Sequence, residues 1–316
     1  MTSGRPMPAM PDDVRAVLDT VADRCSVSTD DARLVHQHSN TAVALPAAGL
    51  LVRIADNPQA LERTKQSVMV TRWLTSRSYP CVESADVEPF LVNGRTVSVW
   101  LLLDVLDGPP GTGAELGRLL RDLHHQPAPP FELRRLTDPL KSVAYAAEHH
   151  PEGMSDRDRS WLLTRINELR TAWAALSTAL PPGLVHGDAH SNNLIRLHSG
   201  EVVLGDWDHA AYGPREWDLV QPHYMQRRFG RHTERELDEF FTTAYGWDIR
   251  SWPGFETLIQ IRELNGLSPY IRKAPSQVWA RREVAHRLTT LRADDSTTGW
   301  NGPPRASDEH YVRDEQ

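Results

Sequence analysis

Lysine, cysteine and long apolar runs are all scarce in this chain of 316 residues. Only three of its 35 basic residues are Lys, and this compositional bias does not indicate a mechanism. The two cysteines, Cys25 and Cys81, are too few for a disulfide framework, and no Cys/His spacing typical of a zinc site is present. The longest apolar run, residues 97–106, is interrupted by Ser98 and Asp104, so we predict no membrane span.

A basic surface and a secretion signal are missing as well. The formal net charge of −7 at pH 7 argues against a nucleic-acid binder that relies on a basic face. Residues 1–13 are polar and Pro-rich and lack the apolar segment of a signal peptide. The shares of hydrophobic residues (40%) and charged residues (24%) are those of an ordinary globular protein. We therefore expect a cytoplasmic protein with neither a nucleic-acid nor a membrane partner.

Strand signals dominate the first third of the chain. Short apolar runs at 42–45 and 50–54 surround Pro46-Ala47-Ala48-Gly49, which is a turn signal. Asn57-Pro58 is typical of a helix start, because Asn caps the helix and Pro is tolerated in its first turn. The helix is expected to run to about Thr75.

A hairpin and a linker follow. Asn93-Gly94, between the apolar runs 90–92 and 95–103, is the strongest short-range signal for a hairpin. Residues 107–113 are rich in Gly and Pro and form a loop or linker by composition. Apolar residues then recur with helical spacing over 114–125, which predicts a change from strands to helices.

The rest of the chain indicates a larger helical lobe. Residues 155–180 are expected to form a long amphipathic helix capped by Ser155, and several helices are expected between 216 and 291. The sequence thus predicts an α+β protein with a small β-rich lobe and a larger α-helical lobe. The expected limits are a flexible N-terminus (1–20), an N-terminal lobe (21–104), a C-terminal lobe (105–292) and a polar tail (293–316).

The most informative stretch is His186-Gly187-Asp188-Ala189-His190-Ser191-Asn192-Asn193, followed by Leu204-Gly205-Asp206-Trp207-Asp208. Four residues separate Asp188 from Asn193, the spacing of the catalytic Asp and the metal-binding Asn in protein kinases. A hairpin of 194–197 and 201–204 would return Asp206 close to Asn193. One carboxylate to accept a hydroxyl proton and two oxygen ligands for Mg²⁺ suit phosphoryl transfer.

Ordinary turn formation would also account for some of these polar residues, because Asp, Asn, Gly and Ser are common in turns. An Asp and an Asn with four residues between them carry no weight by themselves. The pair is preceded by His-Gly, followed by an apolar strand, and completed by Asp-Trp-Asp at the hairpin exit. This combination favours a functional interpretation.

Here the sequence resembles the aminoglycoside phosphotransferase family, whose members are related to protein kinases and choline kinases. The resemblance rests on the two motif segments above and extends over roughly residues 20–290. Gly213-Pro214-Arg215-Glu216-Trp217-Asp218-Leu219 is a further match. The resemblance implies a two-lobed protein-kinase-like fold, with a nucleotide-binding N-terminal lobe and a catalytic, substrate-binding C-terminal lobe.

The resemblance also implies roles for the motif residues. Asp188 is expected to be the catalytic residue that orients the acceptor hydroxyl and takes its proton, while Asn193 and Asp206 hold Mg²⁺. ATP or GTP is the expected phosphate donor. Supporting roles are implied for three neighbours, namely His186, His190 and Asp208.

The phosphate-binding loop departs from that of protein kinases. The glycine-rich loop is absent, and Ser39 and Asn40 are expected to bind the phosphates instead. Arg53 replaces the phosphate-binding Lys of the third strand, and its planar guanidinium binds phosphate oxygens with a different geometry. The helical Glu that pairs with this cation in relatives is replaced by Ser67, which leaves Glu62 as a candidate partner.

The base of the nucleotide is expected at the interlobe hinge, where the backbone of Leu101 and Leu103 would meet it. The acceptor is expected to be a small hydroxylated molecule, either an antibiotic such as an aminoglycoside, which implies antibiotic resistance, or a metabolite. Because aminoglycosides are polycations, carboxylates would line their pocket, and the candidates are Glu216, Asp218 and Glu263.

Two other functions stay open at this point. The missing helical Glu is compatible with a nucleotide-binding module that has no catalytic activity. A metallophosphoesterase is a weaker alternative, because Asp188-Ala189-His190 and Gly205-Asp206 resemble parts of a two-metal site, but the later His and Asn ligands are absent.

Overall fold

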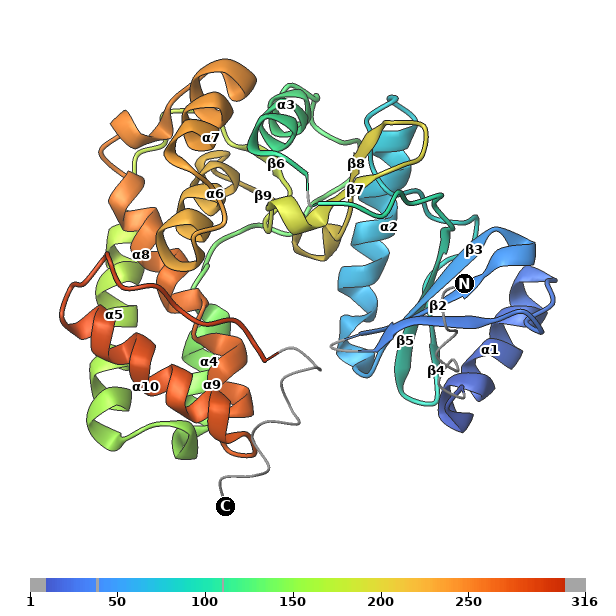
Figure 1. The fold of residues 1–316 in the computed structure, drawn as a ribbon, viewed down its shortest axis with the longest axis horizontal. Coiled ribbons are helices and arrows are strands. Elements are labelled where there is room, and N and C mark those ends of the chain that lie inside the picture. Colours follow the sequence, from blue (N-terminus) through green and yellow to red (C-terminus); the bar gives the residue numbers. More distant parts are fainter. Residues whose placement is uncertain (1–9, 38–39, 110, 305–316) are drawn as a thin grey trace, which may run out of the picture. The chain divides into compact units, whose positions relative to one another are not determined.

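The computed structural model describes residues 10–37, 40–109 and 111–304 and has an α+β architecture (Figure 1). By their contacts, the described residues group into two units. The sheet unit comprises the described residues up to Gly111 together with His125–Leu133 and His186–Ala211. The helical unit comprises Thr112–His124, Arg134–Val185 and the described residues from Tyr212 onward. The predicted α+β class, with a β-rich first part and a helical remainder, is confirmed.

The sheet unit is built on a five-stranded antiparallel sheet of order β1-β2-β3-β5-β4. Its strands are β1 (Arg33–Gln37), β2 (Asn40–Leu45), β3 (Leu50–Ala55), β4 (Phe90–Val92) and β5 (Arg95–Leu101). The predicted hairpin between β4 and β5 is present, and its turn residues Asn93 and Gly94 have φ angles of +50° and +77°. Positive φ at both positions is what a two-residue turn of type I′ requires.

One face of this sheet packs against α1 (Asp12–Cys25). Val14 and Val17 of this helix share a core with Val52 and Ile54 of β3. Because side chains alternate along a strand, Arg53 points to the opposite face. The sequence predicted a flexible segment over 1–20. From residue 12 onward this prediction is wrong, because these residues form α1 and its apolar side is buried in this core.

The helix predicted to begin at Asn57-Pro58 is also confirmed. The Asn57 side chain accepts a hydrogen bond from the Gln59 N–H (2.9 Å) and caps a short 3₁₀ turn, Pro58–Ala60. The helix α2 (Leu61–Thr75) continues from this turn and ends at the predicted residue. It contacts β5 and the turn Trp207–His209, so it bridges the sheet and the motif segment within the sheet unit.

The motif segment is tied to the sheet unit by backbone hydrogen bonds. Its predicted hairpin forms as β7 (Leu194–Arg196) and β8 (Val202–Leu204). The N–H of Leu204 donates to the Pro80 carbonyl (3.0 Å), and the Leu204 carbonyl accepts from the Val82 N–H (3.1 Å). These contacts group residues 186–211 with the sheet, whereas the expected limit at residue 104 separates them from it.

The helical unit consists of helices and one small sheet. The small sheet pairs β6 (Gly183–Val185) with β9 (Ala211–Gly213). The helices are α3 (Gly113–His124), α4 (Lys141–His149), α5 (Asp156–Ala174), α6 (Glu216–Phe229), α7 (Glu234–Asp238), α8 (Phe255–Asn265), α9 (Ser268–Lys273) and α10 (Val278–Arg292). A π-helix, Glu239–Tyr245, follows α7 and packs on α3.

Two helix boundaries and the tail refine the sequence predictions. Ser155 caps α5 as expected, but the helix ends at Ala174 rather than at 180. The N–H groups of Ala179 and Leu180 donate to the Glu216 carboxylate instead of continuing the helix. In the predicted polar tail, Trp300 is buried, so at least this described part of 293–304 packs on the unit. Among the described residues, no helix is long and apolar enough to cross a membrane.

Candidate active site

Asp188 lies in a loop that a buried imidazole connects to β8. His186 is fully buried, and its Nδ1 accepts a hydrogen bond from the Asp188 N–H (3.3 Å). Its Nε2 donates to the Gly205 carbonyl (2.8 Å). Since one ring nitrogen accepts and the other donates, this imidazole is neutral. His186 thus joins the backbone at Asp188 to the backbone that precedes Asp206.

Gly187 brings this loop into close contact with the Trp207–His209 turn. Its φ is +87°, and a Cβ atom at this position would lie 2.2 Å from the His209 carbonyl oxygen. Only glycine accommodates both the positive φ and the close approach. On the other side, Trp207 is buried and its Nε1 donates to the Leu204 carbonyl (2.9 Å). The loop and the turn are therefore positioned by the backbone.

Asn193 and Asp206 lie next to one another, as the hairpin predicted. The Asn193 carbonyl accepts a hydrogen bond from the Gly205 N–H (2.8 Å). The Asn193 side-chain nitrogen donates to the Asp188 carbonyl (2.9 Å), which leaves its side-chain oxygen as a potential ligand. Asp206 has a φ of +56°, a left-handed conformation that is uncommon for a residue other than glycine.

Arg53 forms ion pairs with both carboxylates of the Asp-Trp-Asp segment. Its Nη1 and Nη2 donate to the two oxygens of Asp208 (3.3 and 3.0 Å), and Nη2 also donates to Asp206 (3.1 Å). Burial alone would lower the pKa of Arg53, but the Asp208 and Asp206 carboxylates hold it above its usual value. This fork geometry is available to Arg and not to Lys. Arg53, at the position of the phosphate-binding Lys of protein kinases, can therefore bind both carboxylates at once.

The suggested pairing of Arg53 with Glu62 is wrong. Glu62 points to solvent, where its carboxylate pairs with Lys65 of the same helix (2.7 Å). Ser67, at the position expected for the helical Glu, is buried, and its hydroxyl has no hydrogen-bond partner in the described part of the chain. The acid that faces Arg53 therefore comes from the motif segment, as Asp208, and not from α2.

A cavity of about 310 Å³ opens beside this ion pair within the sheet unit. We call it the Arg53 cavity. Its wall includes Asn40, Arg53 and Asp206 from the predicted site. Six further wall residues were not predicted from the sequence, namely Ala55, Asp56, Asn57, Ala60, Arg63 and His209. The Asn57-Pro58 helix signal was available for most of these, because it places the start of α2 directly after β3.

The remaining predicted nucleotide-binding residues, and His190, are not among the described residues of the Arg53 cavity wall. Ser39 lies outside the described residues. The N–H of Leu101 donates to the Glu83 carbonyl (2.8 Å), and its side chain is partly exposed. Neither Leu101 nor Leu103 belongs to the described wall of the Arg53 cavity. His190 lies beside Asp188, with its Nε2 3.7 Å from a carboxylate oxygen.

Two of the three candidate substrate carboxylates are fully buried in the helical unit. Glu216 accepts the N–H groups of Ala179 and Leu180 (2.6 and 2.8 Å). Asp218 faces the Nε2 of His124 (3.1 Å). These positions correct the expectation of carboxylates that line a substrate pocket, because each side chain is shielded from solvent and hydrogen-bonded within the helical unit.

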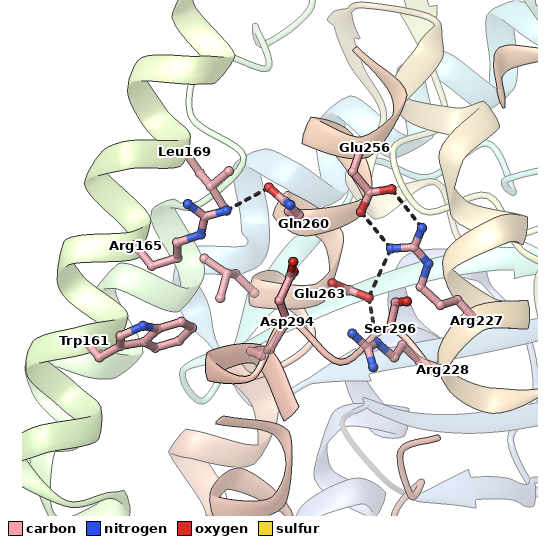
Figure 2. Close-up of a pocket in the computed structure, with 12 residues that line it drawn as sticks. Trp161, Arg165, Leu169, Arg227, Arg228, Glu256, Gln260, Glu263, Asp294 and Ser296 are labelled. Atoms are coloured by element: carbon pink, nitrogen blue, oxygen red, sulfur yellow. Dashed lines mark hydrogen bonds and ion pairs between the residues drawn. The ribbon is translucent and has the colours of Figure 1, made fainter. Parts of the chain in front are cut away.

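Glu263 lines a small pocket of about 40 Å³ in the helical unit (Figure 2). Its carboxylate accepts from the Nε of Arg228 (2.6 Å), and burial raises its pKa although Arg228 and Arg227 act in the opposite direction. Arg227 pairs with Glu256 in the same view (2.8 Å). We call this the Arg228 pocket, lined by Trp161, Arg165, Leu169, Arg227, Arg228, Glu256, Gln260, Glu263, Leu264, Leu291, Asp294 and Ser296.

The donor set around Asp206 fits a hard divalent cation that phosphates also ligate. In the described part of the chain, no group of three or more His, Cys, Asp or Glu residues could hold a metal ion. Magnesium in nucleotide-dependent enzymes is typically held by one or two protein oxygens together with phosphate oxygens and water. The side-chain oxygens of Asn193 and Asp206 match that smaller requirement, whereas a two-metal hydrolase needs a larger ligand set.

The family of this chain follows from comparison with known sequences. A model of the phosphotransferase enzyme family matches residues 32–255, which include both motif segments and the Arg53 cavity. The chain belongs to this phosphotransferase family. A comparison with curated proteins found no match.

Solved structures support the same fold. An amicoumacin kinase in complex with AMP-PNP and Ca²⁺ matches with a TM-score of 0.68 at 14% identity, covering 92% of this chain and 98% of the other. APH(2″)-IIia, in complex with GDP and kanamycin, matches with a TM-score of 0.62 at 13% identity over 89% and 98% of the two chains. An ethanolamine kinase from Plasmodium vivax gives 0.60 at 13% identity over 89% and 88%. The two-lobed kinase-like fold expected from the sequence is thereby confirmed.

Proposed function

We propose that this chain transfers the γ-phosphate of ATP or GTP to a hydroxyl group of a small molecule. The observation that carries the proposal is the Arg53 cavity, where a paired arginine, Asn40 and Asp206 surround a volume of about 310 Å³. The buried His186 and the Asn193 side chain connect this cavity to Asp188 through hydrogen bonds of the backbone. Phosphoryl transfer depends mainly on such positioning of phosphates and acceptor.

Asp188 is the residue that acts on the acceptor. Its carboxylate orients the acceptor hydroxyl and accepts the proton, while the hydroxyl oxygen forms a bond to the γ-phosphorus. The bond from that phosphorus to the bridging oxygen breaks, and ADP or GDP leaves. Asn40 and Arg53, with Ser39, contact the phosphates, and the backbone at Leu101 and Leu103 meets the base. His190, beside Asp188, supports the acceptor side.

Asn193 and Asp206 would hold Mg²⁺ in this enzyme. The ion, when bound, neutralises part of the phosphate charge. For this chain the important consequence concerns Asp206, which in the structure accepts a hydrogen bond from Arg53 and whose carboxylate is substantially exposed. Asp208, which is more enclosed, keeps Arg53 in place through its two hydrogen bonds.

A hydroxylated antibiotic or a hydroxylated amine is the acceptor class that the relatives suggest, since their names include amicoumacin, kanamycin and ethanolamine. An antibiotic acceptor would make the enzyme a resistance determinant. The test is a coupled assay of ADP and GDP release with a panel of aminoglycosides, tuberactinomycin-type peptides, macrolides and hydroxylated metabolites. Acceptor-dependent release that scales with enzyme concentration is the expected result.

Asp188→Ala is the decisive variant for this reaction. We expect transfer to fall by roughly 10³-fold or more because the hydroxyl loses its proton acceptor, while nucleotide affinity stays within about twofold. Asp86→Ala, which removes an exposed carboxylate from the sheet unit, serves as the control and should keep full activity. Full transfer by the Asp188 variant would remove this residue from its proposed role.

A non-catalytic nucleotide-binding module is the second candidate. The absence of the helical Glu suggested this candidate. The ion pair of Arg53 with Asp208 supplies an acid for Arg53 from another segment and so argues against it. Nucleotide binding without turnover across the whole acceptor panel would favour it.

A further inference from the structure

The charged groups around the Arg53 cavity are unequally satisfied. Arg53 is shared by two carboxylates, Asp206 and Asp208, so its charge is more than balanced before any ligand arrives. Asp56, another wall residue, pairs with Arg95 (2.8 Å). Every one of these charges therefore has a protein partner of opposite sign.

Arg63 is the exception on this wall. It belongs to the first turn of α2, three residues after Ala60, and both residues line the cavity. Its side chain is exposed, and in the described part of the chain no carboxylate or carbonyl accepts a hydrogen bond from its guanidinium. Nearby Lys65 differs, because Glu62 neutralises it and it does not belong to the wall.

This arrangement leaves one positive charge of the cavity wall without a neutralising carboxylate among the described residues. The unpaired guanidinium stands at the N-terminal end of a helix, where the backbone dipoles also favour an anion. A guanidinium offers five N–H donors in a planar fork that suits phosphate oxygens. An anion that enters the cavity thus finds one cation already balanced by carboxylates and a second that is free to bind it.

We propose that Arg63 is a phosphate-binding residue of this cavity, and that it contributes the uncompensated positive charge that Arg53 does not. The proposal rests on the proposed nucleotide-binding function. It adds a second phosphate-binding arginine whose role differs from that of Arg53. Arg53 is held in place by Asp208, and Arg63 moves onto the phosphate chain of the nucleotide.

The test measures equilibrium binding without turnover, using fluorescent analogues of ATP and of adenosine with the full-length chain in Mg²⁺ buffer. Three variants are compared with the wild type, namely Arg63→Gln, Arg63→Lys and the control Lys65→Gln. We expect Arg63→Gln to weaken ATP binding roughly tenfold, the effect of losing one hydrogen bond to a charged group, and to leave adenosine binding unchanged. Arg63→Lys should retain part of the affinity, because it keeps the charge but loses the fork.

The outcomes separate this inference from the proposed function. Equal ATP affinities for Arg63→Gln, Lys65→Gln and the wild type would overturn the role of Arg63 and leave the enzyme proposal intact. An equal loss of ATP and adenosine binding would also overturn it, since the effect would then not act through the phosphates. A wild type that binds neither the ATP analogue nor, in the same assay, a fluorescent GTP analogue would overturn both proposals. Thermal melting of each variant checks that the fold is unchanged.

Discussion

The Arg53 cavity and the Arg228 pocket contain the same kinds of side chain in different physical settings. Arg53 pairs with two carboxylates. Arg228 pairs with one carboxylate and donates to two backbone carbonyls. The Arg53 cavity has a volume of about 310 Å³, whereas the Arg228 pocket has about 40 Å³, room for little more than water. Arg53 keeps 23% of its side chain exposed, while Arg228 keeps 2%.

This difference indicates what each network does. A buried ion pair in a closed pocket contributes to the structure, because neither charge can exchange its partner for a ligand. A partly exposed pair beside an open volume can release one carboxylate when a ligand arrives. The presence of Arg and Glu together therefore says little about function until the space around them is known.

Removing one carboxylate from each network tests the comparison with the largest expected effect. Glu263→Ala should lower the free energy of unfolding by about 3 kcal/mol, because Arg228 stays buried without its carboxylate. Asp208→Ala should cost less than about 1 kcal/mol in stability, since Arg53 keeps Asp206 and contact with water, but should reduce kcat/KM roughly tenfold or more.

Chemical denaturation and steady-state kinetics of the two variants provide the measurement. The comparison fails if Asp208→Ala unfolds more easily than Glu263→Ala, or if the latter loses activity at a temperature where it is folded.

A glycine pair tests whether the backbone positions the open site. Gly187→Ala should lower the free energy of unfolding by at least about 2 kcal/mol and reduce transfer, because its methyl group would collide with the His209 carbonyl. Gly200→Ala is the matched control, because Gly200 has the same φ of +87° but no atom within 4 Å of the added Cβ. It should lose only about 1 kcal/mol. Thermal melts and activity assays of both variants would contradict this view if the two losses were equal.

The smallest expected effect concerns pH and the helical unit. Burial, with Arg227 and Arg250 nearby, lowers the pKa of His223 from 6.5 to about 4. Below pH 6.5 the unfolded chain therefore binds a proton that the folded chain does not, so stability should fall as the pH drops from 6.5 to 4. Allowing for partial exposure, this loss amounts to roughly 1–2 kcal/mol.

Urea denaturation between pH 4 and pH 7 measures this slope, and His223→Gln should flatten it. An unchanged slope in the variant would assign the pH dependence to other groups. Nucleotide binding at pH 7 should be unaffected, since His223 belongs to the helical unit and is neutral at that pH.

Local patterns predicted the local structure well. The Asn93-Gly94 turn, the Asn57 cap and the Ser155 cap each depend on a few neighbouring residues, and each forms as expected. The early end of α5 was not predictable in the same way, because the Glu216 carboxylate that accepts the N–H groups of Ala179 and Leu180 lies far along the chain.

The sequence by itself determined the family and the spacing of Asp188, Asn193 and Asp206, because a short loop and a two-stranded hairpin bring these residues together. Tertiary structure alone decided the partners of Arg53. Asp208 is 155 positions away, and only the packing of the motif segment within the sheet unit brings the two together. It also decided that Glu216 and Asp218 are buried and that Arg63 lines a cavity, since burial depends on neighbours from distant parts of the chain.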